Sequence, residues 1–318
     1  MLALAITGPT ASGKTALSLA IAERIPSEII SCDSMQIYKG MDIGTAKATA
    51  EERELVRHHL IDFLSPTESY SVEAYRADAI KALGDISGRG KLPIFVGGTG
   101  LYVGSLMRAS ADAAPGGDPE YRERLLCSVK CEEDKISLWQ RLCEVDPESA
   151  EKIHYNNLKR VIRALEIYDK TGKPKSLLDK ETRELPPEVD IKMITIDFHL
   201  RENLYDRVDR RVDIMMNEGL LAEVEALYRE GLLRDDTTAA QAIGYKEIVA
   251  HLRGECSIAE AVEEIKLASR RYAKRQLTWF RRENAVRIYA DREDGKMKSA
   301  DEFVGEALAV ALELIYDK

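Results

Sequence analysis

The stretch Gly8-Pro9-Thr10-Ala11-Ser12-Gly13-Lys14-Thr15 decides the fold, because it matches the phosphate-loop pattern G-x-x-x-x-G-K-[ST]. An apolar run at residues 2–6 precedes it, and apolar residues at helical spacing follow it over residues 16–21. The order is therefore strand, glycine-rich loop and helix. In such a loop successive backbone N–H groups point inward at the amino end of a helix, so the sequence predicts a site for a di- or triphosphate.

Two side chains complete this predicted site. Lys14 is expected to bring a full positive charge to the terminal phosphate, and the hydroxyl of Thr15 is expected to ligate Mg²⁺. The pattern does not distinguish ATP, GTP or another pyrophosphate compound. In nucleotide hydrolases a later strand ends in an Asp that handles Mg²⁺, whereas residues 92–96 lead here into Gly97-Gly98-Thr99-Gly100. That ending counts against an ordinary nucleotide hydrolase.

Further strand-like runs lie at residues 28–31, 92–96, 191–198 and 285–289, and the segments between them carry helical patterns. This alternation predicts an α/β fold, with a parallel sheet of the P-loop NTPase type flanked by helices. Between Pro115 and about Pro187 the alternation stops, and short helical patterns follow one another. We therefore expect a catalytic core made of residues 1–114 and 191–318, with a helical domain inserted at residues 115–190.

The composition is that of a globular protein, since 45% of the 318 residues are hydrophobic and 32% are charged. These values exclude the disordered and fibrous classes. Residues 2–6 are far fewer than the roughly 20 apolar residues of a membrane span, and no cleavage site follows them, so we expect a cytoplasmic protein without a membrane partner. The five cysteines match no zinc or disulfide pattern and are expected to be reduced thiols.

A carboxylate follows the second predicted strand, because residues 28–31 lead into Cys32-Asp33. Asp33 is expected at the carboxyl edge of the sheet, the same edge as the phosphate loop, where open α/β sheets bind ligands. From there Asp33 could accept a proton from a nucleophile that attacks the phosphate compound, or it could cap the next turn. The position favours the first role and leaves the second open.

A basic helix is predicted near the carboxyl end of the chain. Residues 265–282 contain seven Lys or Arg and no acidic residue, although the formal net charge of the chain is −9. Ser257 and Glu260 form a capping-box pattern that would begin the helix. Arg270, Lys274 and Arg281 fall on one exposed, purely cationic arc. Contact with RNA or a pyrophosphate is favoured over an ordinary solvated surface.

Taken together, these blocks resemble the bacterial tRNA dimethylallyltransferases, which form the IPP transferase family. The resemblance covers nearly the whole chain and rests on collinear blocks: GPTASGKT at 8–15, DSMQIYKGMDIGTAK at 33–47, HHLID at 58–62, GGTGLY at 97–102, DPEYR at 118–122, NNLKRVIRALEI at 156–167, DRRVD at 209–213, AIGYKE at 242–247 and RRYAKRQLTWFRR at 270–282. So many blocks in one order are far more specific than the phosphate loop alone.

The resemblance implies a chemistry for each block. Residues Gly8, Pro9, Thr10, Ala11, Ser12, Gly13, Lys14 and Thr15 would hold the diphosphate of dimethylallyl diphosphate, with Mg²⁺ on Thr15. Asp33 would take the proton from the N6 amine of the adenosine on the 3′ side of the anticodon as that amine attacks the allylic carbon. Arg211 would act with Lys14 and Mg²⁺ on the leaving group. Asp33, Thr99 and Arg211 are thus the implied catalytic residues.

The resemblance also implies how tRNA is bound. Asp33, Ser34, Met35, Gln36 and Thr99 would line a channel for the extruded base. In the insertion, Arg122 and the run Lys159, Arg160, Val161, Ile162 and Arg163 would hold the anticodon stem-loop, although the run taken by itself favours a solvated helix face. We expect a monomer.

Two other functions are compatible with a phosphate loop. A small-molecule kinase could place a substrate-binding Asp after the second strand, and Arg207, Arg210 and Arg211 could form its lid. The inserted domain and the basic helix count against it, since a small substrate requires neither. A GTP-driven RNA-binding switch would need an N-K-x-D element, and the sequence contains none.

Overall fold

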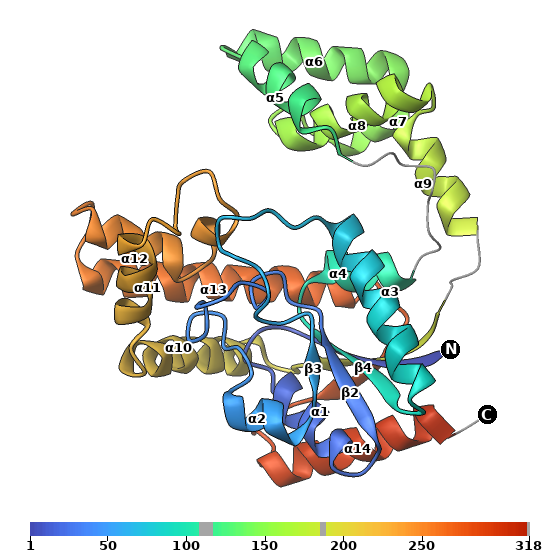
Figure 1. Cartoon of the computed structure of the whole chain (residues 1–318), viewed down its shortest axis with the longest axis vertical. Helices are drawn as coiled ribbons and strands as arrows, with labels where there is room; N and C mark the ends of the chain where they lie inside the picture. Colours follow the sequence, from blue (N-terminus) through green and yellow to red (C-terminus); the bar gives the residue numbers. More distant parts are fainter. Residues whose placement is uncertain (108–116, 185–188, 317–318) are drawn as a thin grey trace. The chain divides into compact units, whose positions relative to one another are not determined.

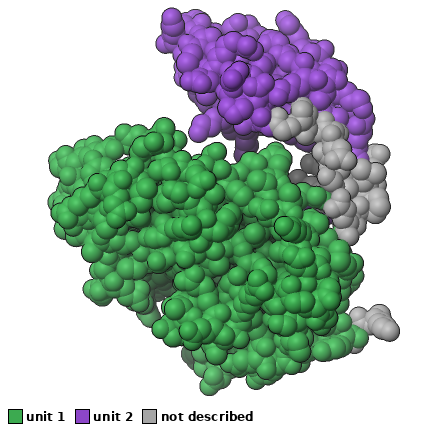
Figure 2. Space-filling view, in the orientation of Figure 1, with its two compact units in different colours: residues 1–104, 189–318 green, residues 105–188 purple. Residues whose placement is uncertain are grey.

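The computed structural model describes residues 1–107, 117–184 and 189–316. The chain divides into two compact units, shown in different colours in Figure 2. The first combines Met1–Gly104 with Val189–Lys318, and the second is Ser105–Glu188. The first unit is built from two separate stretches of sequence. The boundary that we expected at residues 114 and 115 lies outside the described residues.

The first unit is organised around a six-stranded sheet (Figure 1). Its strands are β1 (Leu2–Thr7), β2 (Ser27–Ser31), β3 (His58–His59), β4 (Leu92–Gly97), β5 (Asp190–Asp197) and β6 (Val286–Tyr289). They lie in the order β3-β2-β4-β1-β5-β6, and every neighbouring pair is parallel. The predicted parallel α/β fold is therefore confirmed, and the carboxyl ends of the strands share one edge.

The five strands predicted from sequence are all present. β3 was not predicted, because two half-buried histidines give no pattern of alternation or continuous apolarity. Every residue of β2, and every residue of β1 except Leu2, is buried, so the sheet is covered on both faces. Ile37, Tyr38 and Met41, which follow β2, belong to a second apolar cluster together with Val212, Leu220 and Tyr245.

Helices of the first unit surround the sheet and extend beyond it. They are α1 (Lys14–Ala22), α2 (Ala50–Leu55), α3 (Val72–Gly88), α4 (Gly100–Met107, which reaches into the second unit), α10 (Arg201–Asn217), α11 (Leu220–Arg229), the 3₁₀ turn η1 (Ala239–Gln241), α12 (Tyr245–Leu252), α13 (Ile258–Phe280) and α14 (Ala300–Tyr316). α13 begins with the predicted capping box, in which Ser257 accepts from the backbone of Glu260 and the Glu260 side chain accepts from the backbone of Ser257. That long helix carries several residues of the site described below.

The second unit is a set of short helices with a core of its own. They are α5 (Pro119–Ser128), α6 (Glu132–Val145), α7 (Pro147–Lys152), α8 (Leu158–Thr171) and α9 (Lys175–Glu184). α5 and α7 each begin with an Asp cap followed by Pro at the first helical position, as the Asp-Pro pairs in the sequence suggest. The inner face of α8 packs on α6 and α7 through Leu142, Ala150 and Leu165.

Among the described residues, no helix combines the length and the apolarity needed to cross a bilayer. The five cysteines are all free, as predicted.

Candidate functional site

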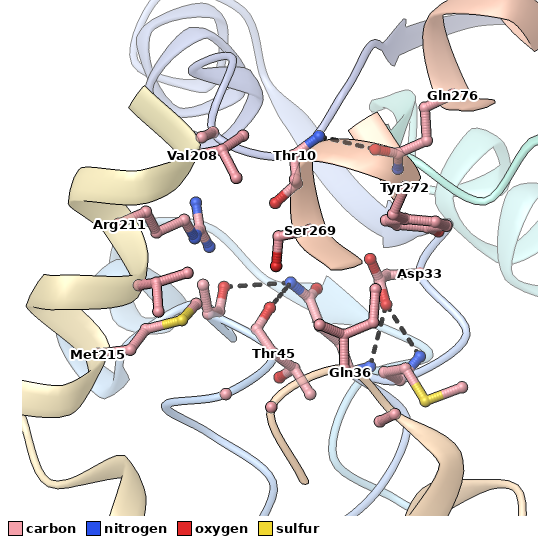
Figure 3. Close-up of a pocket in the computed structure, with 18 of the residues that line it drawn as sticks. Thr10, Asp33, Gln36, Thr45, Val208, Arg211, Met215, Ser269, Tyr272 and Gln276 are labelled. Atoms are coloured by element: carbon pink, nitrogen blue, oxygen red, sulfur yellow. Dashed lines mark hydrogen bonds between the residues drawn. The ribbon is translucent and has the colours of Figure 1, made fainter. Parts of the chain in front are cut away.

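A pocket of about 730 Å³ opens in the first unit at the carboxyl edge of the sheet (Figure 3). Its lining comes from residues 10–15, 33–36, 44–46 and 241–244, with side chains of α10 and α13. In Figure 3, Arg211 and Met215 reach in from α10, Asp33 and Tyr272 lie opposite them, and Ser269 lies between the two groups. The parallel strand order brings these segments together although they are far apart in sequence.

The phosphate loop forms one end of the pocket. α1 begins directly after Gly13, which provides no side-chain cap, so the N–H groups of its first turn remain available to an anion. Lys14 Nζ donates to the carbonyls of Gly8 (3.2 Å) and Pro9 (2.7 Å). Burial and the charge of Arg211 lower the pKa of Lys14 to about 8, although Asp33 acts in the opposite direction. The buried hydroxyl of Ser12 has no hydrogen-bond partner within the described part of the chain.

The charge of the pocket is strongly positive. Of its lining side chains in the described ranges, Lys14, Arg207, Arg210, Arg211 and Arg275 are cationic, and Asp33 alone is acidic. Arg211 has a buried Nε for which the described residues offer no acceptor, and burial lowers its pKa. Arg207 Nε donates to the carbonyl of Ala11, 2.7 Å away, so this arginine contacts the phosphate loop itself. A bound polyanion would relieve this concentration of positive charge.

The carboxylate of Asp33 caps a turn with one oxygen and leaves the other oxygen available. Its Oδ1 accepts hydrogen bonds from the backbone N–H groups of Met35 (2.9 Å) and Gln36 (3.3 Å), and therefore caps the turn after β2. Within the described ranges no hydrogen bond reaches Oδ2. Tyr272 lies close by, and its pKa is raised to about 12 by burial and by the charge of Asp33. The capping role and the proton-accepting role are thus compatible, because they use different oxygens.

Thr99 and Gln36 hold the neighbouring loops in place. The hydroxyl of Thr99 accepts from the backbone N–H of Ser34 at 3.1 Å, which connects the end of β4 to the Asp33 turn. The amide nitrogen of Gln36 donates to the carbonyls of Thr45 (3.2 Å) and Ala46 (3.1 Å), as Figure 3 shows.

Gln276 is a site residue that sequence reasoning missed. Its Oε1 accepts from Thr10 N, and its Nε2 donates to Gly98 O, each at 2.9 Å. It therefore ties the phosphate loop to the loop after β4. A Cβ at Gly98 would lie 2.1 Å from Nε2, so the approach requires glycine. One feature of the sequence could have indicated it: helical periodicity places Gln276, an uncharged polar residue, on the buried side of a basic helix.

The cationic arc predicted on α13 is only partly free, because two of its three cations form ion pairs. Arg270 forms an ion pair with Asp209 of α10 at 2.6 Å, and Arg281 pairs with Asp197, the buried last residue of β5, at 3.0 Å. Arg281 is exposed as predicted, whereas Arg270 is half-buried, and part of the charge of each is taken up by a carboxylate from a distant part of the chain. Their contact with RNA stays a prediction. Lys274 is exposed and has no ion-pair partner in the described residues.

The basic run of α8 also needs correction. Val161 and Ile162 are 0% and 1% exposed and lie in the interior of the helical unit, so they cannot contact RNA directly. Arg163 pairs with the buried Glu166. Lys159 and Arg160 are exposed.

Arg122, from α5, pairs with the same buried Glu166 at 2.9 Å, and 41% of its side chain is exposed. The sequence pattern predicted a helix at α8, but it could not separate the inner face from the outer face within residues 159–163, which contain three cations and two apolar residues.

Sequence comparisons show which family this chain belongs to. The profile of the IPP transferase family matches residues 36–283, and a profile described as isopentenyl transferase matches residues 1–69. This chain belongs to the IPP transferase family. The tRNA dimethylallyltransferase of Acetivibrio thermocellus is 50% identical over 296 residues, which are 93% of this chain and 94% of that protein.

Solved structures of the family agree. The tRNA isopentenylpyrophosphate transferase of Bacillus halodurans is 41% identical, with a TM-score of 0.70, and the match covers 99% of this chain and 96% of that one. A eukaryotic dimethylallyltransferase acting on tRNA is 30% identical, with a TM-score of 0.84, over 100% of this chain and 80% of that one. Family membership favours prenyl transfer over the kinase and switch alternatives.

Proposed function

We propose that this protein transfers the dimethylallyl group of dimethylallyl diphosphate to the N6 amine of the adenosine 3′ of the anticodon in tRNA, and releases diphosphate. The observation that carries the proposal is a single carboxylate with an available oxygen, placed in a cationic pocket beside a diphosphate loop. Close relatives with the name tRNA dimethylallyltransferase support it.

The leaving group defines one part of the pocket. Residues 8–15 bind the diphosphate through backbone N–H groups, and Lys14, Arg207 and Arg211 neutralise the charge that develops when the carbon–oxygen bond breaks and its electron pair moves to the diphosphate. The prenyl tail fits the apolar part of the lining, which includes Met35, Val212, Met215, Leu220, Ile243 and Ile265.

The acceptor amine requires a base, because its lone pair is delocalised into the purine ring. As the new nitrogen–carbon bond forms, the amine loses a proton, and Asp33 Oδ2 accepts it. The two backbone N–H groups on Oδ1 fix the orientation of the carboxylate. Thr99 supports the same turn through Ser34. The base reaches this position by leaving its stack.

Mg²⁺ fits the donor groups of the phosphate loop. Within the described ranges no three His, Cys, Asp or Glu side chains gather into a metal cluster, so the protein ligand would be the hydroxyl of Thr15, which lines the pocket. Mg²⁺ prefers oxygen ligands and is often held by one protein group together with substrate phosphates. When bound, it would add positive charge to the diphosphate.

Binding of the tRNA body falls to exposed cations. We assign this role to Lys159, Arg160 and the exposed part of Arg122 in the helical unit, and to Lys274 of α13. Phosphate contacts of this kind give affinity and orientation rather than sequence readout. The protein would act in the cytoplasm, where tRNA is found. It would act as a monomer, which a measurement of its molar mass by light scattering at working concentration tests.

The reaction is tested with purified protein, Mg²⁺ and an unmodified tRNA that carries adenosine 3′ of its anticodon. Dimethylallyl diphosphate should raise the mass of that nucleoside by one dimethylallyl unit, while ATP should give neither ADP nor a phosphorylated product. ATP turnover stimulated by a small metabolite, with the tRNA recovered unmodified, would favour the kinase.

Asp33→Asn should bind both substrates within a few-fold of wild type and lose about 10²–10⁴ in the transfer rate, because an amide cannot accept the proton. Single-turnover transfer measures this loss without interference from product release. A variant that transfers at the wild-type rate would remove Asp33 from the mechanism.

A further inference from the structure

One wall of the pocket is a loop without regular structure. Gly44, Thr45 and Ala46 line the pocket, and the segment between β2 and α2 that contains them forms neither helix nor strand at this point. Ala46 has a left-handed backbone with φ of 47°, which is unfavourable for a residue with a Cβ. Two hydrogen bonds within the loop, from Ala46 N to Ile43 O and from Lys47 N to Asp42 O, each 3.0 Å long, close the turn. Its position in the pocket wall depends in addition on contacts from other elements.

Glu223 of α11 holds the outer side of this loop. Its Oε2 accepts hydrogen bonds from the backbone N–H groups of Asp42 (2.9 Å) and Ile43 (2.7 Å), and its Oε1 accepts from that of Gly44 (3.2 Å). The hydroxyl of Tyr245 donates to Oε1 at 2.6 Å. One carboxylate thus satisfies three consecutive backbone donors, which is an arrangement typical of a bound anion and stronger than neutral hydrogen bonds.

The inner side of the loop is held by Gln36, whose amide nitrogen donates to the carbonyls of Thr45 and Ala46. The backbone N–H of Gln36 is also one of the two donors to Asp33 Oδ1. A continuous series of hydrogen bonds therefore runs from Glu223 through the loop and Gln36 to the carboxylate that accepts the proton. Each connection in it is between groups 2.7–3.3 Å apart.

The loop has little room to move away from this position. A Cβ at Gly44 would lie 2.5–2.7 Å from atoms of the Tyr245 ring, so the backbone already rests against that ring. Tyr245 itself is fully buried. Glu223 is absent from the described lining of the pocket, and it acts from behind the loop.

We propose that Glu223 is a positioning residue for prenyl transfer, which fixes the loop of residues 42–46 and, through Gln36, the turn that carries Asp33. The inference rests on the proposed function, because the step that it controls is the transfer. Its physical basis is that catalysis depends on reacting groups held at near-contact geometry, so a small displacement of the base slows the reaction without removing any reactive group.

Glu223→Gln tests the inference, because glutamine has the same size but only one acceptor oxygen. Its NH₂ group would face either the backbone N–H groups of Asp42 and Ile43, or the backbone N–H of Gly44 and the hydroxyl of Tyr245. We expect amide hydrogen exchange at residues 42–44 to accelerate about tenfold or more, and single-turnover transfer at saturating substrates to fall about 10- to 100-fold. Affinity for tRNA should stay within about twofold, since the loop contributes no phosphate contact.

Glu225→Gln is the matched control. Glu225 lies on the same helix and forms an ion pair with Arg229 on the surface. In Glu225→Gln, amide hydrogen exchange at residues 42–44 and the transfer rate should both stay at wild-type values. Gly44→Ala is an independent variant that keeps Glu223 and displaces the loop from the Tyr245 ring. It should slow transfer in the same way as Glu223→Gln, and it shows whether the position of the loop governs the reaction.

Wild-type exchange at residues 42–44 in Glu223→Gln would overturn the proposed clamp, and fast exchange with a wild-type transfer rate would overturn its role in the reaction. Failure of the proposed function looks different. In that case wild type and Glu225→Gln would transfer nothing, while exchange at residues 42–44 would still report whether Glu223 fixes the loop.

Discussion

Lys14 shows how a single residue of the phosphate loop is tuned by its surroundings. Its Nζ donates to the carbonyls of Gly8 and Pro9 rather than to an acidic side chain. Burial and Arg211 favour its neutral form, and Asp33 favours its charged form. The result is a pKa of about 8, so Lys14 changes charge in a pH range where an exposed lysine stays protonated.

Binding of inorganic diphosphate should therefore depend on pH. Below about pH 8 Lys14 is charged before the anion arrives, and above it a proton must be taken up on binding, so affinity should fall as pH rises through 8. Calorimetry in buffers of different ionisation enthalpy should detect proton uptake near pH 8. Lys14→Arg should abolish both effects, because arginine remains charged throughout. Proton uptake that persists in Lys14→Arg would assign the titration to another group.

At the scale of one element, α13 combines three tasks along its length. Gln276 joins two loops of the site, Tyr272 lies beside Asp33, and Arg270 and Arg281 anchor the helix to α10 and β5. Internal ion pairs therefore account for part of its basic composition.

Lys274→Ala and Arg270→Ala should separate these roles. Loss of Lys274 should lower the affinity for different tRNAs equally and lower the slope of log K against log salt by about 1, without changing the free energy of unfolding.

Loss of Arg270 leaves Asp209 unpaired and should lower the free energy of unfolding by about 1–2 kcal/mol. Urea denaturation and salt-dependent binding measure the two effects. An unchanged salt slope for Lys274→Ala would show that this lysine faces no phosphate.

The same helix shows what sequence can and cannot predict. Its start at Ser257 is encoded within four residues and was predicted correctly, as were the phosphate loop and the position of Asp33 after a strand. The partners of Arg270 and Arg281 lie about 61 and 84 residues away, and no helical periodicity contains them. Gln276, likewise, acts by joining Thr10 to Gly98. The residue pattern of a single helix or strand does not predict contacts with distant segments of the chain.

At the scale of the whole molecule, the two units divide the substrates between them in our proposal. The first unit contains the diphosphate loop and Asp33, and the second presents exposed cations on α8. Each has its own apolar core, so substitutions on the surface of one should leave the other folded.

Reversal of charge at Lys159 and Arg160 should accordingly lower tRNA affinity about tenfold or more and reduce the salt slope by about 2, because two phosphate contacts are lost. Diphosphate binding should not change. Lys135→Glu, on α6 of the same unit, controls for a general change of charge, since Lys135 pairs locally with Glu132. Filter binding at several salt concentrations measures the tRNA affinity and its salt slope. If Lys135→Glu lowered the tRNA affinity as much as the reversal at Lys159 and Arg160, a specific role for α8 would be refuted.

The strand order also determines what the ribosome exposes while it makes this protein. In the finished sheet β1 lies between β4 and β5, but the whole of Ser105–Glu188 is translated before β5. At about 5–20 residues per second, that stretch takes roughly 4–17 s to make. Throughout this interval the nascent chain has one edge of β1 unpaired, and such an edge is a template for association with other chains. Lengthening the insertion would prolong this exposure and increase aggregation in the cell, even though the mature sheet would be unchanged.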